Sequence, residues 1–537
     1  MTRQLRGAES GADEGPTGEG PTGDGPTGDG PTGEGPMDES PCGDGPSGPM
    51  PEGPTSELPL AGDPAPDGSV IWTRVLAPAG GAPVPVLWTV AEDASFTTIV
   101  AGGMVLATAD GGHCVTVPVG GLAPDRWYTY RFEVDGVVGR TGRLRTSPAP
   151  GSSPDHLRFA FASCQQLNDS WFVAHQAIAA EPDLDFLVHL GDYVYVSDTG
   201  TQSVDDYRAC YRRWRERPEL RDLHAAVPTV AMWDDGEFYN GNDRFGPPQR
   251  LANAKQAWFE AFPYVNAGDD ENHRLIDWGD LADLPVIDVR SHRDPYLDTV
   301  DLTQGEGLEA YDPARSTLGP AQFDWLCGVL GSSDAAWRLI QQGYPIHPWR
   351  LLNLEFLRPF RPDLPPNAGL YVPSDGWDHF MAERRDLFDF LASSGVRDNV
   401  FCSGQTHIFM ASALRPDPSD PRSPVVGFDV VNGSLTADPD PRSAYLGDLP
   451  TDLAEGALHL AEQWVLGQNS PDLRYMNLLD QGYTVVDVTP ERVEVTFRMI
   501  DTFDPHATAY DGAKFRIDRG ATKAVALPGT RRRGSFA

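Results

Sequence analysis

Residues 185–195 read DFLVHLGDYVY, an apolar run that ends in a glycine, an aspartate and two tyrosines. The run has the length and aliphatic content of a buried strand, and Gly191 permits a sharp turn directly after it. In an open α/β sheet, ligands bind beyond the carboxyl ends of the strands. We therefore expect Asp192 to lie at a functional site.

Three further segments carry polar side chains at the end of an apolar run. They are Ser163-Cys164-Gln165, Asp234-Asp235-Gly236-Glu237 and Ser403-Gly404-Gln405-Thr406-His407. One such turn is commonly a loop with a capping aspartate, and one buried cysteine is usually a small hydrophobic residue. Four turns at strand ends indicate instead that a thiol, several carboxylates and an imidazole meet at one site.

These residue types are typical of a metal centre. Carboxylate oxygens suit hard cations, imidazole suits iron, zinc or manganese, and a thiolate favours a softer or ferric ion. Asp192 could bridge two cations, and such a pair polarises a phosphoryl oxygen and activates a bound water. The pattern predicts a metal-dependent phosphoester hydrolase. The alternatives are a hydrolase of other esters and a catalytically silent binding or scaffold protein on the same fold.

The organisation of the chain indicates a disordered tail and two folded domains. Residues 11–36 repeat Gly-Pro-Thr-Gly-Asp/Glu with few apolar side chains, so we expect disorder over 1–56. Short alternating strands at 69–75, 85–90, 113–119 and 127–134 predict a small immunoglobulin-like β-sandwich over 57–150.

From residue 155 onward, strands alternate with helices, which is typical of an α/β layered domain. This domain is expected over 155–510, with a loose tail over 511–537. Strands are predicted at 157–162, 185–190, 227–233, 284–290, 336–340 and 399–403, helices at 171–181 and 384–393, and an antiparallel pair at 483–488 and 492–498 that closes the sheet.

Composition restricts the possible partners. The 537 residues carry a formal net charge of −36, which disfavours binding to a nucleic acid backbone. No apolar run approaches the ~18 residues of a membrane span, and the N-terminus lacks the apolar core of a secretory signal, so a cytoplasmic location is expected. Six scattered cysteines without a C-x-x-C pair predict reduced thiols. The sequence does not determine the oligomeric state.

The four segments resemble, in order, the motifs of the PhoD-like alkaline phosphatase family: Ser-Cys-Gln, Gly-Asp-Tyr-x-Tyr, Asp-Asp-His-Glu and Ser-Gly-Asp-x-His. The resemblance extends over roughly residues 58 to 510. Similar supporting segments are Leu60-Ala61-Gly62-Asp63-Pro64, Asp288-Val289-Arg290 with Arg293, residues 318–326 (LGPAQFDWL), and Trp377 with Arg384-Arg385.

The resemblance implies a metallophosphoesterase-like α/β sandwich and hydrolysis of small-molecule phosphomonoesters or phosphodiesters with ferric iron (Fe3+) and calcium (Ca2+). By position, the iron ligands would be Cys164, Asp192, Tyr195 and His407. Asp192 would bridge to calcium, and Asp234, Asn240 and Gln405 would complete the metal ligands. Asp235 and His407 are the expected catalytic residues.

Two positions depart from the family motifs. Gly236 stands where the family has histidine, and Gln405 where it has aspartate. The amide removes a negative charge on which a hard divalent cation depends. The lost histidine removes a possible proton donor, a kind of group that contributes ~10²–10⁴-fold in rate. A weakened second site, a pseudoenzyme and a shifted metal all remain open, and Glu237 or His224 could replace the missing group.

Arg290 and Arg293 are the candidate substrate-binding residues. A guanidinium group can form a forked pair of hydrogen bonds with a phosphate. An internal ion pair with Asp288 or Asp294 is an equally good interpretation.

Overall fold

The structure is a computed structural model that describes residues 55–529, except for 77–80, 197–199, 266–270, 303–306, 365–366, 373–374, 421 and 438–448. The tail predicted for residues 1–56 lies outside this part of the chain, apart from its last two residues. Residues 530–537 of the predicted C-terminal tail also lie outside it.

The N-terminal region consists of two β-sheets around a common core. One sheet contains β1 (Thr55–Ser56), β2 (Leu60–Ala65), β3 (Gly68–Leu76) and β6 (Cys114–Val119). The other contains β4 (Val84–Ala91), β5 (Ile99–Ala107), β7 (Trp127–Val134), β8 (Val137–Val138) and β9 (Gly142–Arg145). Alternate residues point inward, so that Ile71 of the first sheet and Tyr130 of the second belong to the same buried cluster. The four strands predicted here are present.

The larger region is built on two seven-stranded sheets. The order in the first is β12 (Thr229–Ala231), β11 (Phe186–His189), β10 (Leu157–Ala162), β22 (Gln481–Val488), β23 (Arg492–Ile500), β24 (Tyr510–Asp518) and β25 (Val525–Ala526). The order in the second is β13 (Arg274–Trp278), β14 (Ala282–Val286), β15 (Trp337–Gln341), β18 (Asn399–Ser403), β20 (Gly427–Val431), β19 (Phe409–Leu414) and β21 (Leu473–Asn477). Apolar side chains from both sheets, such as Phe159 and Val400, form one core.

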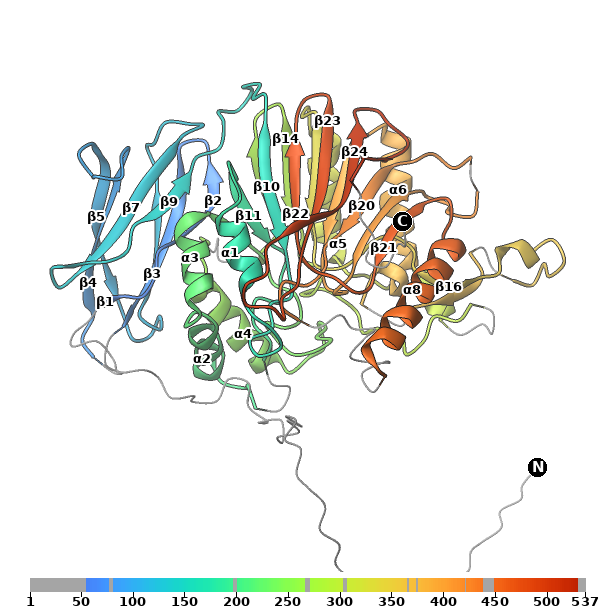
Figure 1. Cartoon of the computed structure of the whole chain (residues 1–537), viewed down its shortest axis with the longest axis horizontal. Helices are drawn as coiled ribbons and strands as arrows, with labels where there is room; N and C mark the ends of the chain where they lie inside the picture. The colour runs from blue at the N-terminus through green and yellow to red at the C-terminus, as the bar shows by residue number, and fades with distance from the viewer. Residues whose placement is uncertain are drawn as a thin grey trace, which may run out of the picture. The chain divides into compact units, whose positions relative to one another are not determined.

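Helices cover the outer faces of the two sheets (Figure 1). The helices α1 (Val173–Ala179), α2 (Val204–Trp214), α3 (Pro218–Ala226) and α4 (Pro248–Ala261) pack on the first sheet. Helices α5 (Gly319–Ser332) and α6 (Met381–Ser394) pack on the second, and α8 (Thr451–Gln468) packs near β19 and β21. The remaining elements are the pair β16 (Arg350–Asn353) and β17 (Gly369–Tyr371) and the 3₁₀ helices η1 (Leu308–Tyr311), η2 (Glu355–Leu357) and η3 (Trp377–His379).

The prediction of a loose tail from residue 511 is wrong for its first part. Residues 510–518 form β24, which pairs antiparallel with β23, and β25 extends the sheet further. The alternating residues Ala513, Phe515 and Ile517 are buried in the core between the sheets, and this burial holds the strand in place. The pair β22–β23 therefore lies inside the sheet and does not close it.

Strand direction determines where the site lies. Strands β10, β11 and β12 are mutually parallel, and so are β14, β15, β18 and β20. Their carboxyl ends carry the segments singled out in the sequence. An isolated bridge between Ser163, after β10, and Ser434, after β20, links the two sheets at this end.

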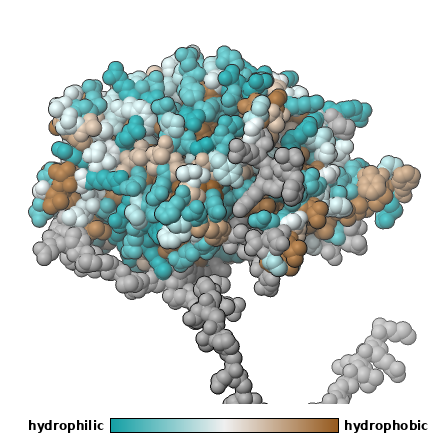
Figure 2. Space-filling model, viewed as in Figure 1, coloured by the Kyte–Doolittle hydropathy of each residue, from teal (hydrophilic) through white to brown (hydrophobic). Residues whose placement is uncertain are grey.

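Hydrophilic residues predominate on the face of the molecule shown in Figure 2. Within the described ranges, no helix combines the length and hydropathy needed to cross a membrane.

Cys210 is in a disulfide, so the expectation of reduced thiols does not hold for this residue. Cys114, Cys164, Cys327 and Cys402 are free.

Candidate metal centre

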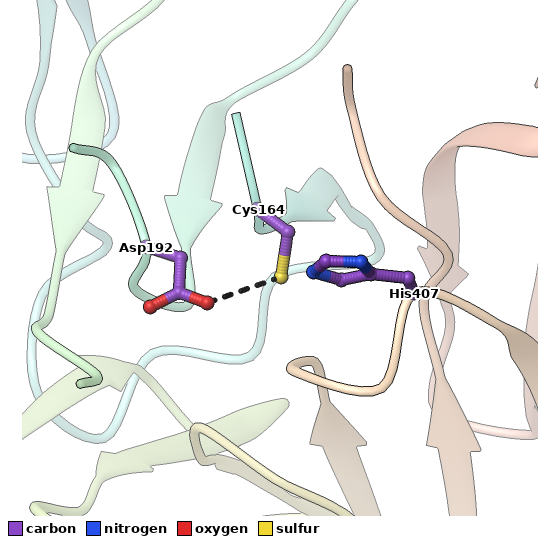
Figure 3. A group of neighbouring side chains, drawn as sticks. All are labelled: Cys164, Asp192 and His407. Carbon is purple, nitrogen blue, oxygen red and sulfur yellow. Dashed lines mark hydrogen bonds between the residues drawn. The ribbon is translucent and has the colours of Figure 1, made fainter. Parts of the chain in front are cut away.

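Cys164, Asp192 and His407 come from three separate strand ends and meet at one point (Figure 3). They follow β10, β11 and β18, and one ligand atom from each lies within 4.8 Å of the others. The Cys164 thiol donates to Asp192 Oδ2 at 3.5 Å. The backbone of all three residues is left-handed, with φ of 62°, 54° and 54°. Such conformations cost on the order of 1–3 kcal/mol each and concentrate at functional sites.

Tyr195 completes this group. Its hydroxyl lies 3.2 Å from Asp192 Oδ2 and 3.1 Å from His407 Nε2. The structure thus brings together all four residues predicted as iron ligands. Cys164 and Asp192 are buried, whereas Tyr195 and His407 are partly exposed, so solvent reaches the group from the side of Tyr195 and His407.

Glu237 holds the turns on which these side chains sit. Its carboxylate accepts the backbone N–H groups of Asp192 at 3.0 Å, Tyr193 at 2.8 Å and Asp234 at 2.9 Å. His224 is buried and shares a hydrogen bond of 2.8 Å with the hydroxyl of Tyr193. Both side chains are therefore engaged away from the open side of the site, and neither takes the place of the histidine missing at position 236.

Gln165 supports the same turn from the other side, a role that the sequence did not reveal. Its Nε2 donates to the carbonyl of Tyr193 at 2.7 Å, and its Oε1 lies 2.8 Å from His175 Nε2. Trp214 Nε1 donates to the Gln165 carbonyl at 2.8 Å. These buried contacts fix the segment that follows Cys164.

A second cluster adjoins the first and contains Asp192, Asp234 and Asp235, whose ligand atoms also lie within 4.8 Å of one another. Asp234 forms a very short ion pair with Arg290 Nε. Arg290 Nη2 lies 2.7 Å from Asp375 Oδ2 and 3.6 Å from Asp235 Oδ1. Asp375 was not predicted from the sequence, and its only sequence signal is its position two residues before Trp377.

Gln405 faces the same carboxylates. Its Nε2 donates to Asp235 Oδ1 at 3.1 Å and to Asp375 Oδ2 at 3.3 Å. The backbone N–H of Gly241 donates to Asp235 Oδ2 at 2.6 Å. Asn240, the residue before Gly241, is exposed, and its role as a ligand stays a prediction.

Both candidate substrate-binding arginines are fully buried. Arg290 pairs with Asp234, Asp235 and Asp375, which lie far from it in the sequence. Arg293 Nη2 donates to the Gly241 carbonyl at 2.6 Å, and its guanidinium carbon lies 3.6 Å from the centre of the Tyr296 ring. The backbone N–H of Arg290 donates to Asp288 at 2.9 Å, but within the described residues neither guanidinium forms an ion pair with Asp288 or Asp294. Arg293 Nη1 is buried and has no hydrogen-bond partner within the described residues. Substrate binding by these side chains stays a prediction.

The electrostatics of the site follow from burying like charges together. Burial, and then Asp235 and Asp234, raise the pKa of Asp192 well above its usual value. Burial raises the pKa of Asp234 to about 7 although Arg290 opposes it. Burial also acts to raise the pKa of Asp235, but Arg290 and the Gly241 N–H outweigh it and the pKa is lowered. Burial and the Asp192 charge raise the pKa of the Cys164 thiol. A bound cation would relieve this repulsion at Cys164 and Asp192.

Comparisons with known proteins agree with this fold and site. A family model described as "PhoD-like phosphatase, N-terminal domain" matches residues 60–148, and one described as "PhoD-like phosphatase" matches residues 159–497. The chain belongs to the PhoD-like phosphatase family, a class of phosphoester-hydrolysing enzymes.

Individual relatives are similar over most of their length. The chain is 30% identical over 500 residues to alkaline phosphatase D of Bacillus subtilis (strain 168), and the match covers 86% of this chain and 80% of that protein. A solved structure of PhoD superposes with a TM-score of 0.75 at 29% sequence identity, covering 89% of this chain and 93% of the other.

Proposed function

We propose that this protein is a metal-dependent hydrolase of small-molecule phosphomonoesters or phosphodiesters, with a ferric ion held by Cys164, Asp192, Tyr195 and His407. The convergence of these four side chains from three strand ends is the observation that carries the proposal. A thiolate, a phenolate and a carboxylate together offer the anionic donors that a trivalent ion requires, and an imidazole suits iron. When bound, such an ion would act as a Lewis acid toward a phosphoryl oxygen and activate water.

The fold supports this assignment. We assign the two seven-stranded sheets and their outer helices to the metallophosphoesterase-like α/β sandwich, and the N-terminal sheets to an immunoglobulin-like β-sandwich. The supporting observations are the common core of each pair of sheets and the parallel strands whose carboxyl ends meet at the site.

The residues around the proposed metal site have different roles. Asp235 is held as a carboxylate by Arg290 and the Gly241 N–H, and its lowered pKa suits a group that orients a water molecule. Glu237 and Gln165 position the turn that carries Asp192 and Tyr195. His407 lies at the accessible side of the site and is therefore both a ligand and a candidate contact for substrate.

Metal analysis and hydrolysis assays test the proposal. Purified protein should contain iron and hydrolyse p-nitrophenyl phosphate or its bis-ester. The Cys164→Ala variant should lose iron, whereas Cys402→Ala, which removes an equally buried thiol from the core between the sheets, should keep it. A folded protein that takes up no iron and hydrolyses neither ester would favour the catalytically silent alternative.

A further inference from the structure

We infer that this protein holds a single cation, and that Gln405 and Arg290 replace the second cation of the predicted pair. The inference rests on the proposed function, because it concerns the same carboxylates. The residues present fit the predicted iron side of the site. On the predicted calcium side, hydrogen bonds and ion pairs from the protein already engage most of the carboxylate oxygens.

Gln405 is the central residue. Its amide nitrogen lies between the carboxylates of Asp235 and Asp375 and donates to both, at 3.1 and 3.3 Å. An aspartate at this position would place a third negative charge against two others and would need a cation to balance it. The amide removes that charge and supplies a donor, so the cluster is stable without calcium.

The oxygen of Asp192 that faces the second cluster is also engaged. The backbone N–H of Gly236 donates to Asp192 Oδ1 at 2.8 Å. A Cβ at position 236 would lie 2.7 Å from this oxygen and 2.6 Å from the Val194 carbonyl. The turn therefore packs closely against Asp192 where the family has a histidine, and one acceptor site of Asp192 Oδ1 is already used by the protein.

Arg290 provides the positive charge that balances the carboxylates of this cluster. Its guanidinium is fully buried and contacts the carboxylates of Asp234, Asp235 and Asp375. A Cβ at Gly343 would lie 2.8 Å from Asp234 Oδ1, so Asp234 has backbone against its other side. Two buried oxygens of this cluster, Asp234 Oδ2 and Gln405 Oε1, lack a hydrogen-bond partner within the described part of the chain. Calcium takes six to eight oxygen ligands, and two free oxygens beside carboxylates already paired with Arg290 fall well short of such a site.

The inference implies that this protein requires iron alone, whereas the family resemblance implies iron and calcium. The proposed iron ligands are Cys164, Tyr195, His407 and Asp192 Oδ2, whereas the side chain of Gln405 donates to Asp235 and Asp375. We therefore expect the native protein to bind one iron per chain and to show no response to calcium. Restoring the carboxylate should restore calcium binding, because Asp235, Asp375 and the new side chain would then repel one another without it.

The experiment measures metal content and calcium binding in the full-length, iron-loaded protein. Elemental analysis should give one iron and no stoichiometric second metal, and calorimetric titration with CaCl2 should give no saturable heat. Gln405→Asp should gain saturable calcium binding and a calcium-dependent rise in its unfolding temperature. Gln405→Asn, which keeps a neutral amide, should gain neither.

Two results would overturn the inference. One is a native protein that binds calcium with a Kd of about 10 µM or tighter, the range of calcium sensors. The other is a folded Gln405→Asp variant whose calcium affinity equals that of the native protein. Failure of the proposed function has a different signature, namely absence of iron and of hydrolysis, and leaves the calcium titration interpretable. The measurement on the native protein decides the inference if Gln405→Asp does not fold.

Discussion

The carboxylate of Glu237 accepts the backbone N–H of Asp192 at 3.0 Å and thereby fastens the turn after β12 to the turn after β11. The same carboxylate accepts two further N–H groups, from Tyr193 and Asp234. A single buried side chain therefore sets the distance between the two acidic turns of the site.

Replacing Glu237 with alanine should destabilise the whole protein. Three buried N–H groups would lose their acceptor, and each unsatisfied donor costs about 1–3 kcal/mol. We expect a loss of at least 3 kcal/mol in the free energy of unfolding and a reduced iron content, measured by urea denaturation and elemental analysis. Glu216→Ala, at an exposed position, is the control and should change neither. Equal stability of the two variants would contradict this role of Glu237.

The sequence predicted that Cys164, Asp192 and His407 meet because each of their turns follows an apolar strand. Cys164, Asp192 and His407 stand directly after such runs, and parallel strands bring their carboxyl ends together. Predicting that these residues meet therefore requires only the order of the strands and their parallel direction.

The contacts of Asp375 and Arg290 could not be predicted in the same way. Asp375 lies in a loop before η3, with no strand to mark it, and its contacts with Arg290 and Gln405 join residues far apart in the sequence. Asp288 and Asp294, the acids near Arg290 in the sequence, are not its ion-pair partners within the described residues. The tertiary structure instead supplies Asp234, which follows a strand of the other sheet. Likewise, β24 was missed because its pairing depends on β23 and on burial in the core between the sheets.

Replacing Gly236 with a larger residue should destabilise the protein, even when that residue is the histidine of the family motif. In Gly236→Ala the new Cβ would lie within 2.7 Å of Asp192 Oδ1 and Val194 O, so the turn must shift. We expect a loss of about 1–3 kcal/mol in stability for Gly236→Ala, by analogy with overpacking of a core, and no gain in hydrolysis for Gly236→His. Thermal unfolding and p-nitrophenyl phosphate turnover measure the two effects.

A helical glycine provides the matched control for this substitution. Gly328 lies in α5, and a Cβ there would meet no atom within 4 Å. Gly328→Ala should therefore be neutral or stabilise the protein by up to ~1 kcal/mol. A Gly236→His variant that is as stable as the native protein and hydrolyses esters faster would show that the turn can open.

The colour of the iron-loaded protein should depend on Tyr195. Its hydroxyl lies beside Asp192 Oδ2 and His407 Nε2, where it can bind the same ion. Phenolate bound to Fe(III) absorbs visible light, so Tyr195→Phe should lose or shift the visible band while the protein stays folded. Tyr510→Phe, in β24 and near the surface, should leave the spectrum unchanged. A Tyr195→Phe spectrum identical to the native one would remove Tyr195 from the ligand set.

The buried histidines should make the protein sensitive to acid. Burial lowers the pKa of His175, His189 and His347 from 6.5 to about 3, so each is neutral in the folded state at pH 5. The unfolded chain binds protons at these positions below about pH 6.5, and unfolding therefore takes up protons. The stability contributed by each neutral histidine is complete above pH 6.5 and is lost as the pH falls toward 3, by about 2 kcal/mol at pH 5.

His189 allows one of these contributions to be isolated. Neither of its ring nitrogens has a hydrogen-bond partner within the described ranges, so leucine can replace it without leaving a polar group unpaired. The stability of His189→Leu relative to the native protein should rise by about 2 kcal/mol between pH 7.5 and pH 5, because the variant has no proton to take up on unfolding. Urea denaturation at a series of pH values measures this difference. Parallel stability curves for the two proteins would mean that His189 is protonated in the folded state or that its proton affinity does not change on unfolding.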